Sequence, residues 1–97
     1  MAKGYWVVAY RSISDLDKLA AYGKLASVAI AEAGGRVLVR GGQVTPREAG
    51  LNERTVLIEF PSYEAALDAY GTEAYQKALV ALDGAVERDL RITQGVD

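Results

Sequence analysis

Apolar residues recur along the chain with two different spacings, and stretches of the two kinds alternate. Residues 4–11 form a continuous aromatic and β-branched run, which is typical of a strand covered on both faces. Residues 15–33 repeat apolar side chains at helical spacing and end at the Gly34-Gly35 pair, which suits a helix C-terminus. We therefore predict a strand and then a helix, with Ser14 as the N-terminal cap.

The same alternation continues through the rest of the chain. Three more strands are predicted at residues 36–41, 54–60 and 87–94. A long loop over residues 42–52 separates the first two of them, and a second helix is predicted over residues 63–82, with a break at residues 71–72. The order β-α-β-β-α-β predicts one ferredoxin-like α+β domain over residues 1–97, with a four-stranded antiparallel sheet and two helices on one face.

The first predicted strand has two apolar rows, although helices cover only one face of such a sheet. The two rows are Tyr5, Val7 and Ala9, and Trp6, Val8 and Tyr10. A contiguous exposed apolar patch usually marks an interaction surface, and a twofold contact needs only one self-complementary patch. We predict a homodimer whose sheets pack face to face. The alternative is that a bent sheet and the long loop cover the second face within one chain.

The amino-acid composition limits the partners, metals and cofactors that we expect for this protein. The 97 residues include 11 Lys and Arg against 13 Asp and Glu, and this balance disfavours nucleic acid and anionic membranes as partners. The chain has no Cys and no His, and its acidic residues lack the spacing of a calcium loop, so we expect no metal and no cofactor. Neither a signal-peptide pattern nor an apolar run of roughly 20 residues is present, and we expect a cytoplasmic protein.

Glu59 is the most informative polar residue, because it stands between Ile58 and Phe60 in a predicted strand. A carboxylate in a dry pocket has a raised pKa, which suits a general acid or base. A carboxylate beside a cation has a lowered pKa and is more often structural, and Arg40 on the preceding predicted strand is the candidate cation. Both interpretations of Glu59 stay open: a catalytic group, or one half of a structural Arg40–Glu59 pair.

Aromatic side chains form the second group of candidates. They are Trp6, Tyr10, Tyr22, Tyr70 and Tyr75. Tyrosine hydroxyls near a carboxylate could orient or protonate a small substrate, and Tyr22 and Tyr75 are the candidates for that role. In small α/β domains, however, tyrosines more often pack in the core or at an interface with the hydroxyl at the rim.

Two segments of the sequence also resemble a known family. The segments are Arg40-Gly41-Gly42 and Glu59-Phe60-Pro61-Ser62. Together, at this separation, they resemble the small bacterial domain-of-unknown-function family numbered 1330, and the resemblance extends over residues 3–96. It implies a dimeric α+β barrel, and it places Tyr22, Arg40, Glu59 and Tyr75 at positions where a pocket is expected. The family has no agreed biochemical activity.

Two functions remain open at this stage. Related barrels include cofactor-independent monooxygenases and isomerases, and this resemblance implies a site for a small anionic or aromatic metabolite. In such a site Arg40 would hold an anionic group, Glu59 would transfer a proton, and Tyr22 or Tyr75 would orient the substrate. The alternative is a non-catalytic dimer that binds a metabolite or another protein, in which Arg40 and Glu59 are structural.

Overall fold

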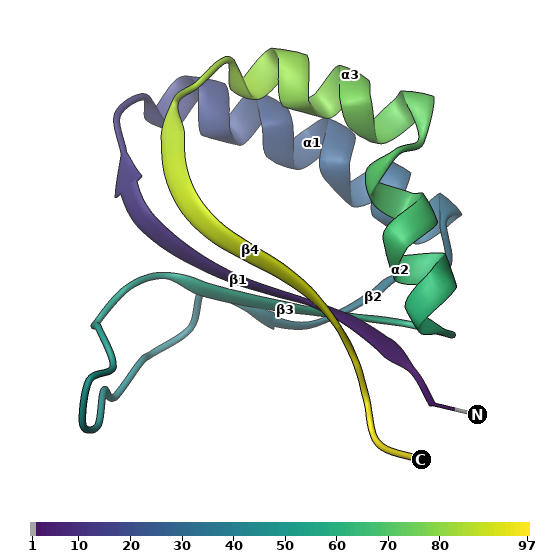
Figure 1. The fold of residues 1–97 in the computed structure, drawn as a ribbon. Coiled ribbons are helices and arrows are strands. Elements are labelled where there is room, and N and C mark those ends of the chain that lie inside the picture. The colour runs from purple at the N-terminus through teal and green to yellow at the C-terminus, as the bar shows by residue number, and fades with distance from the viewer. Residues whose placement is uncertain (1) are drawn as a thin grey trace.

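Two layers make up the fold: a four-stranded antiparallel sheet, and three helices that lie on one of its faces (Figure 1). The computed structural model describes residues 2–97. In chain order the elements are β1 (Gly4–Ile13), α1 (Leu16–Glu32), β2 (Arg36–Arg40), β3 (Thr55–Phe60), α2 (Tyr63–Tyr70), α3 (Glu73–Leu82) and β4 (Val86–Gln94). The strands lie side by side in the order β2-β3-β1-β4, which confirms the predicted ferredoxin-like α+β fold.

The second predicted helix is in fact two helices, so the expected count of two becomes three. The chain breaks at Gly71 and Thr72, as predicted, and the hydroxyl of Thr72 accepts a hydrogen bond from the backbone N–H of Tyr75 at 3.2 Å. This bond caps the first turn of α3 and starts a separate helix in a new direction. The observed order is therefore β-α-β-β-α-α-β.

The cap of α1 also differs from the prediction. Asp15, not Ser14, is the N-cap: its carboxylate accepts hydrogen bonds from the backbone N–H groups of Asp17 and Lys18 at 3.0 and 3.1 Å. The hydroxyl of Ser14 instead donates to the carbonyl of Ala85, just before β4, at 3.0 Å. Ser14 and Asp15 are both suitable N-cap residues. Because the hydroxyl of Ser14 is bonded to Ala85, Asp15 takes the capping position.

Side chains of β1 alternate between the two faces of the sheet, as predicted. The row that faces the helices is Trp6, Val8 and Tyr10, and all three residues are buried. On the outer face, Val7 pairs with Leu57 of β3, and Leu57 pairs with Val39 of β2. An apolar row therefore crosses three adjacent strands on the face that no helix covers.

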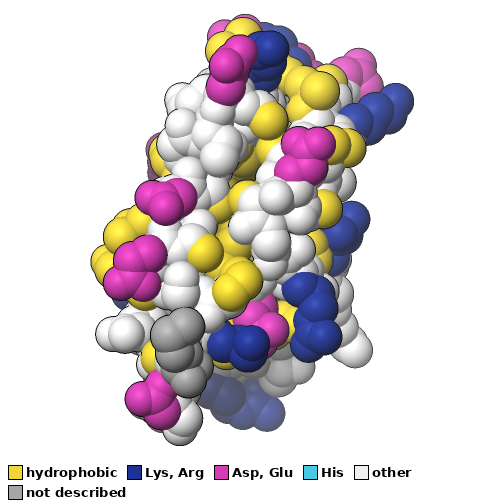
Figure 2. Space-filling model, turned by 90° about the vertical axis from the view of Figure 1, so that its right-hand side faces the viewer, with side chains coloured by type: hydrophobic (Ala, Val, Ile, Leu, Met, Phe, Trp, Pro, Cys, Tyr) yellow, Lys and Arg dark blue, Asp and Glu magenta, His cyan; other side chains and the backbone are white. Residues whose placement is uncertain are grey.

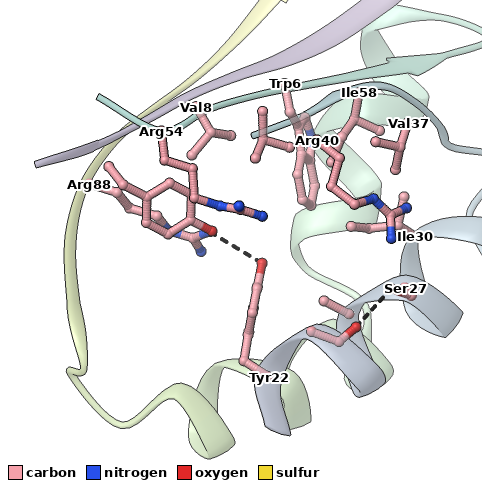
Figure 3. A pocket seen from close by; sticks show the side chains of 14 residues that line it. Trp6, Val8, Tyr22, Ser27, Ile30, Val37, Arg40, Arg54, Ile58 and Arg88 are labelled. Atoms are coloured by element: carbon pink, nitrogen blue, oxygen red, sulfur yellow. Dashed lines mark hydrogen bonds between the residues drawn. The ribbon is translucent and has the colours of Figure 1, made fainter. Parts of the chain in front are cut away.

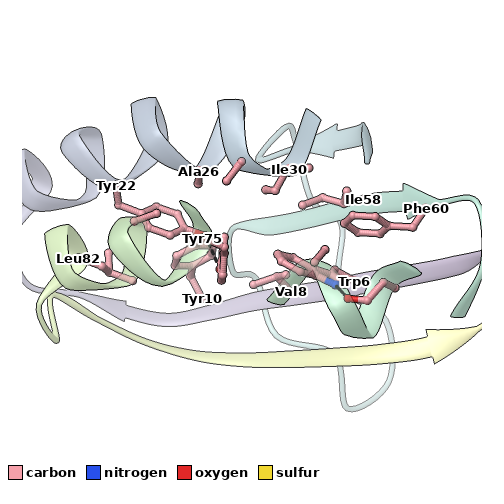
Figure 4. Packing of buried hydrophobic residues seen from close by; sticks show 14 of the residues in the cluster. Trp6, Val8, Tyr10, Tyr22, Ala26, Ile30, Ile58, Phe60, Tyr75 and Leu82 are labelled. Atoms are coloured by element: carbon pink, nitrogen blue, oxygen red, sulfur yellow. Dashed lines mark hydrogen bonds between the residues drawn. The ribbon is translucent and has the colours of Figure 1, made fainter. Parts of the chain in front are cut away.

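Trp6 lies at the centre of the core between the sheet and the helices (Figure 4). Its indole is 1% exposed, and its ring centroid lies 5.2 Å from that of Phe60 and 4.9 Å from that of Tyr75. The indole N–H donates to the carbonyl of Ala66 at 2.8 Å and so ties α2 to β1. Phe60 and Tyr75 are also almost fully buried, and these three large rings fix the spacing between the two layers.

The side of the molecule near α2 shows apolar side chains interspersed with charged groups of both signs (Figure 2). No large patch of a single sign gathers on this face. Among the helices of residues 2–97, none has both the length and the apolar character that a membrane crossing requires.

Candidate functional site

A cavity of about 100 Å³ lies between α1 and the inner face of the sheet, and it is partly open to solvent (Figure 3). Its walls are mainly apolar and consist of Trp6, Val8, Gly23, Ala26, Ile30, Val37, Val56 and Ile58, with Tyr10, Tyr22 and Ser27 as uncharged polar residues. Three arginines complete the lining: Arg40, Arg54 and Arg88. Among the described residues that line the cavity there is no Asp or Glu.

Strand register places Arg54 and Arg88 on either side of Tyr10. The backbone N–H of Tyr10 donates to the carbonyl of Arg54 at 3.0 Å, and on the other side Tyr10 pairs with Arg88 of β4. The Cζ atom of each guanidinium lies 5.7 Å from the centroid of the Tyr10 ring. An aromatic face attracts a cation at this distance, so Tyr10 helps to hold both charges at the cavity.

A β-bulge turns Arg40 toward the cavity. The pairing of β2 with β3 shifts between Val37 and Val39, and as a result Arg40 stands opposite Val56, whose side chain also lines the cavity. The residue after Arg40 is Gly41, which has a φ of +63°.

Gly41 also makes room for Arg54. A Cβ atom on Gly41 would lie only 2.2 Å from Nη1 of Arg54, so any larger residue there would displace the guanidinium. The Arg40-Gly41 pair of the family-like segment therefore has a physical explanation. Its first residue supplies one cation, and its second leaves space for another.

Arg88 and three tyrosines form a hydrogen-bonded cluster at the inner end of the cavity. Nη1 of Arg88 donates to the hydroxyls of Tyr10 and Tyr22 at 3.3 and 3.2 Å, and Nη2 donates to the hydroxyl of Tyr75 at 2.9 Å. The hydroxyls of Tyr22 and Tyr75 are 2.7 Å apart and share a further hydrogen bond. Burial, reinforced by the neighbouring Tyr22, raises the pKa of Tyr75 well above its ordinary value, so this phenol stays protonated.

None of the three arginines of the cavity forms an ion pair within residues 2–97. Elsewhere in the chain Arg11, Arg36 and Arg91 each lie beside a carboxylate. Burial by itself would lower the pKa of Arg88, but Tyr22 and Tyr75 outweigh burial, and the pKa is raised. The cavity is therefore lined by three permanent positive charges that no carboxylate of the described chain neutralises.

The structure brings together some of the residues predicted for a site and separates one of them. Tyr22 and Arg40 line the cavity, and Tyr75 lies directly behind Tyr22. Glu59 is on the outer face of the sheet, because its neighbours Ile58 and Phe60 point into the core.

The predicted Arg40–Glu59 pair is therefore wrong. Glu59 stands opposite Arg36 in the sheet, and Nη2 of Arg36 lies 4.0 Å from Oε1 of Glu59. The bulge in β2 is the physical reason for the error, because it puts Arg40 on the inner face while Glu59 keeps the regular outward alternation.

Sequence reasoning missed Arg54 and Arg88. A signal for Arg88 was present, since it precedes Leu90 and Ile92 at the spacing of two that keeps side chains on one face of a strand. Arg54 carried the same kind of signal, since it precedes Val56 and Ile58 at this spacing within the predicted strand over residues 54–60.

A metal site finds no support in the described part of the chain. No group of three or more His, Cys, Asp or Glu residues gathers there in an arrangement that could hold an ion. What the cavity offers is hydrogen-bond donors and positive charge, which suit an anionic ligand.

The fold and the cavity together define a ferredoxin-like α+β protein with an arginine-lined cavity between its first helix and the sheet. The chain belongs to the family described as Domain of unknown function (DUF1330), whose model matches residues 3–96. This match confirms the resemblance inferred from the Arg-Gly-Gly and Glu-Phe-Pro-Ser segments.

Several solved structures share the fold at low sequence identity. A protein of unknown function from Rhodopseudomonas palustris superimposes with a TM-score of 0.75 at 19% identity, covering 99% of this chain and 84% of that one. A variant of SnoaB, a cofactor-independent oxygenase from Streptomyces nogalater, superimposes with a TM-score of 0.60 at 8% identity, covering 99% and 94%. An ethyl tert-butyl ether d family protein from Bacillus halodurans superimposes with a TM-score of 0.61 at 11% identity, covering 99% of this chain and 100% of that one. No curated protein matches the chain.

Proposed function

We propose that the protein binds a small organic anion in the cavity between α1 and the sheet. One observation carries the proposal: Arg40, Arg54 and Arg88 line one cavity, and none of them pairs with a carboxylate of residues 2–97. Three unneutralised cations repel one another, so an arrangement of this kind favours a negatively charged ligand.

The size and walls of the cavity limit the ligand further. The cavity has a volume of about 100 Å³ and is partly open to solvent, so a small ligand can fill it and extend beyond its mouth. Its apolar walls favour a hydrocarbon body, and the exposed side chains of Arg40 and Arg54 favour a carboxylate near the mouth. The oxygenase described above has the same fold, which is consistent with a small-molecule site.

Glu59 has no part in this proposal, because its carboxylate is on the other face of the sheet. The protein groups that could move a proton at the cavity are the phenols of Tyr10 and Tyr22. The binding proposal therefore stands whether or not the ligand is transformed.

Benzoate is a suitable first probe, and Arg54→Gln is expected to weaken its binding about tenfold. The change removes one charged hydrogen-bond donor at the cavity mouth, and such a bond is worth about 1.5–3 kcal/mol before solvent screening reduces it. Binding can be followed by NMR titration, with the indole N–H of Trp6 as a reporter, since the chain has one tryptophan and it lines the cavity.

The matched control is Arg47→Gln. Arg47 is an exposed arginine in the loop between β2 and β3 and lies outside the cavity, so its loss should leave benzoate binding unchanged. If neither benzoate nor any other small carboxylate shifted the resonances of the cavity residues, the proposal would be wrong.

We also propose that a second copy of the chain covers the outer face of the sheet. The apolar row Val39, Leu57 and Val7 supports this proposal, because it crosses three strands on a face that no helix covers, and Val7 and Val39 are 38% and 39% exposed. Charged residues flank the row. Arg36 and Glu59 lie beside it on β2 and β3, and Asp89 and Arg91 lie on β4, where Arg91 pairs with Val7. An apolar centre with a polar rim is typical of a subunit interface.

Leu57→Lys is expected to convert this dimer to a monomer, because it places a charge at the centre of the apolar row. The measurement is light scattering coupled to size-exclusion chromatography, with circular dichroism to verify the fold. Val80→Lys on α3 is the matched control, since Val80 is 78% exposed on the opposite layer. A wild-type chain that is monomeric at micromolar concentration would refute the dimer.

A further inference from the structure

The tyrosine cluster at the inner end of the cavity contains more hydrogen-bond donors than acceptors. Arg88 uses three of its N–H groups on the hydroxyl oxygens of Tyr10, Tyr22 and Tyr75. Each phenol also carries a proton of its own that needs an acceptor. Where these three protons point determines what the cavity can bind.

Within the part of the chain that the structure describes, the proton of Tyr75 has one available acceptor. Tyr75 is 0% exposed, and apart from Arg88, which can only donate, its hydroxyl contacts the hydroxyl of Tyr22 at 2.7 Å. Tyr75 must therefore donate to Tyr22, because otherwise its proton would be buried without a partner. The oxygen of Tyr22 then accepts two hydrogen bonds, one from Tyr75 and one from Arg88.

Within residues 2–97 the hydroxyls of Tyr22 and Tyr10 make no further hydrogen bond in which they donate, so both are available as donors to a ligand. Both side chains line the cavity, and both hydroxyls accept from the same Nη1 atom of Arg88, so they lie close together. Two O–H donors beside a guanidinium match the two oxygens of a carboxylate. The two hydrogen bonds that the Tyr22 oxygen accepts also polarise its O–H group and make it a stronger donor.

A further cation of the cavity lies apart from the tyrosine cluster. Arg54 lies on the same side of the cavity as Arg88, with each Cζ atom 5.7 Å from the centroid of the Tyr10 ring, whereas Arg40 lies on the other side (Figure 3). Between Arg40 and this cluster Figure 3 shows the side chain of Trp6, which is one of the apolar walls of the cavity. The cavity therefore offers cations at two places and a hydrocarbon surface between them.

We infer that the ligand is a small dicarboxylate. One carboxylate is held by the hydroxyls of Tyr10 and Tyr22 beside Arg88 and Arg54, and the other by Arg40. The inference rests on the proposed function and narrows it from any small organic anion to one with negative charge at both ends. Tyr22 is the residue that sets this specificity.

The test compares each dicarboxylate with its own monoamide. Succinate, glutarate and isophthalate are titrated into the wild-type protein alongside succinamate, glutaramate and 3-carbamoylbenzoate. An amide replaces one acceptor oxygen with an NH₂ donor and removes one charge, at nearly constant shape. At least one dicarboxylate of the series is expected to bind about tenfold more tightly than its monoamide, because a hydrogen bond to a charged group is the stronger kind.

In Tyr22→Phe the dicarboxylate is expected to bind no more than about threefold more tightly than its monoamide, because the change removes the O–H donor and keeps the ring. Tyr70→Phe is the matched control, since Tyr70 contacts Trp6 and Tyr75 through its ring but does not line the cavity. The wild-type comparison of acid and amide does not depend on any variant, so a Tyr22→Phe protein that failed to fold would leave the test intact.

The outcomes separate the two proposals. If no carboxylate of any kind binds in the cavity, the proposed function fails, and the dicarboxylate inference fails with it. If benzoate and the monoamides bind as tightly as the dicarboxylates, anion binding stands and only the dicarboxylate inference is overturned. A preference for the dicarboxylate that survived Tyr22→Phe unchanged would likewise overturn the role of Tyr22 in specificity.

Discussion

Replacement of Trp6 by alanine is expected to lower the free energy of unfolding by about 3–5 kcal/mol, the usual cost of truncating a large buried aromatic residue. Trp6 is 1% exposed, and its ring packs against those of Phe60, Tyr70 and Tyr75. The substitution leaves a void between the sheet and the helices, and it leaves the carbonyl of Ala66 without the indole N–H. Urea denaturation followed by circular dichroism measures the loss.

Trp6→Phe separates packing from hydrogen bonding. The phenyl ring keeps much of the contact with Phe60 and Tyr75 but cannot donate to Ala66, so the expected loss is about 1–2 kcal/mol, near the net worth of one hydrogen bond. If Trp6→Ala cost less than about 1 kcal/mol, the packing of the two layers would not depend on Trp6, and its central place in the core would be refuted.

The fold could be predicted from the sequence because its signals are local and agree with one another. The alternating rows of β1, the Gly34-Gly35 stop and the break before Thr72 each act within a few residues. The cap of α1 was misassigned because Ser14 and Asp15 are equally good caps, and the contact of Ser14 with Ala85 joins residues far apart in the chain. Local patterns cannot rank alternatives that a distant contact decides.

The candidate site was predicted less completely, for a related reason. Tyr22 and Arg40 were identified, but Arg40 was paired with the wrong residue because the bulge between Val37 and Val39 has no sequence signature. Arg88 could have been found from its spacing to Leu90, although a charged residue facing inward conflicts with the usual polarity of strands. That conflict is itself informative, because functional sites are where local rules are broken.

The arginines of the cavity are expected to lower the stability of the protein when no anion is bound. Arg40, Arg54 and Arg88 line one cavity, and no carboxylate of residues 2–97 neutralises them. Gly41, which leaves space for Arg54, adds conformational freedom to the unfolded chain. A core selected for stability alone would contain neither feature. Ligand binding would neutralise the charges and stabilise the fold, so the proposed anion should raise the melting temperature.

Arg88→Met is expected to weaken dicarboxylate binding about 100-fold, which corresponds to ~2.7 kcal/mol. Arg88 supplies charge at the inner end of the cavity, and its hydrogen bonds to the oxygens of Tyr10 and Tyr22 leave the two O–H groups available to the proposed ligand. Methionine keeps much of the volume and removes both effects. The measurement is the same NMR titration, with succinate, glutarate and isophthalate as ligands.

Arg88→Lys distinguishes the charge from the geometry. Lysine restores a positive charge, but a single ammonium cannot reproduce the planar fork that contacts three phenols at 2.9 to 3.3 Å. We expect an affinity between those of the wild-type and Arg88→Met proteins, about tenfold below the wild type. Equal affinity for Arg88→Lys and the wild type would mean that charge alone is recognised, and wild-type affinity in Arg88→Met would remove Arg88 from the site. The intermediate result is the one that a preorganised tyrosine cluster requires, because only the guanidinium fixes all three hydroxyls at once.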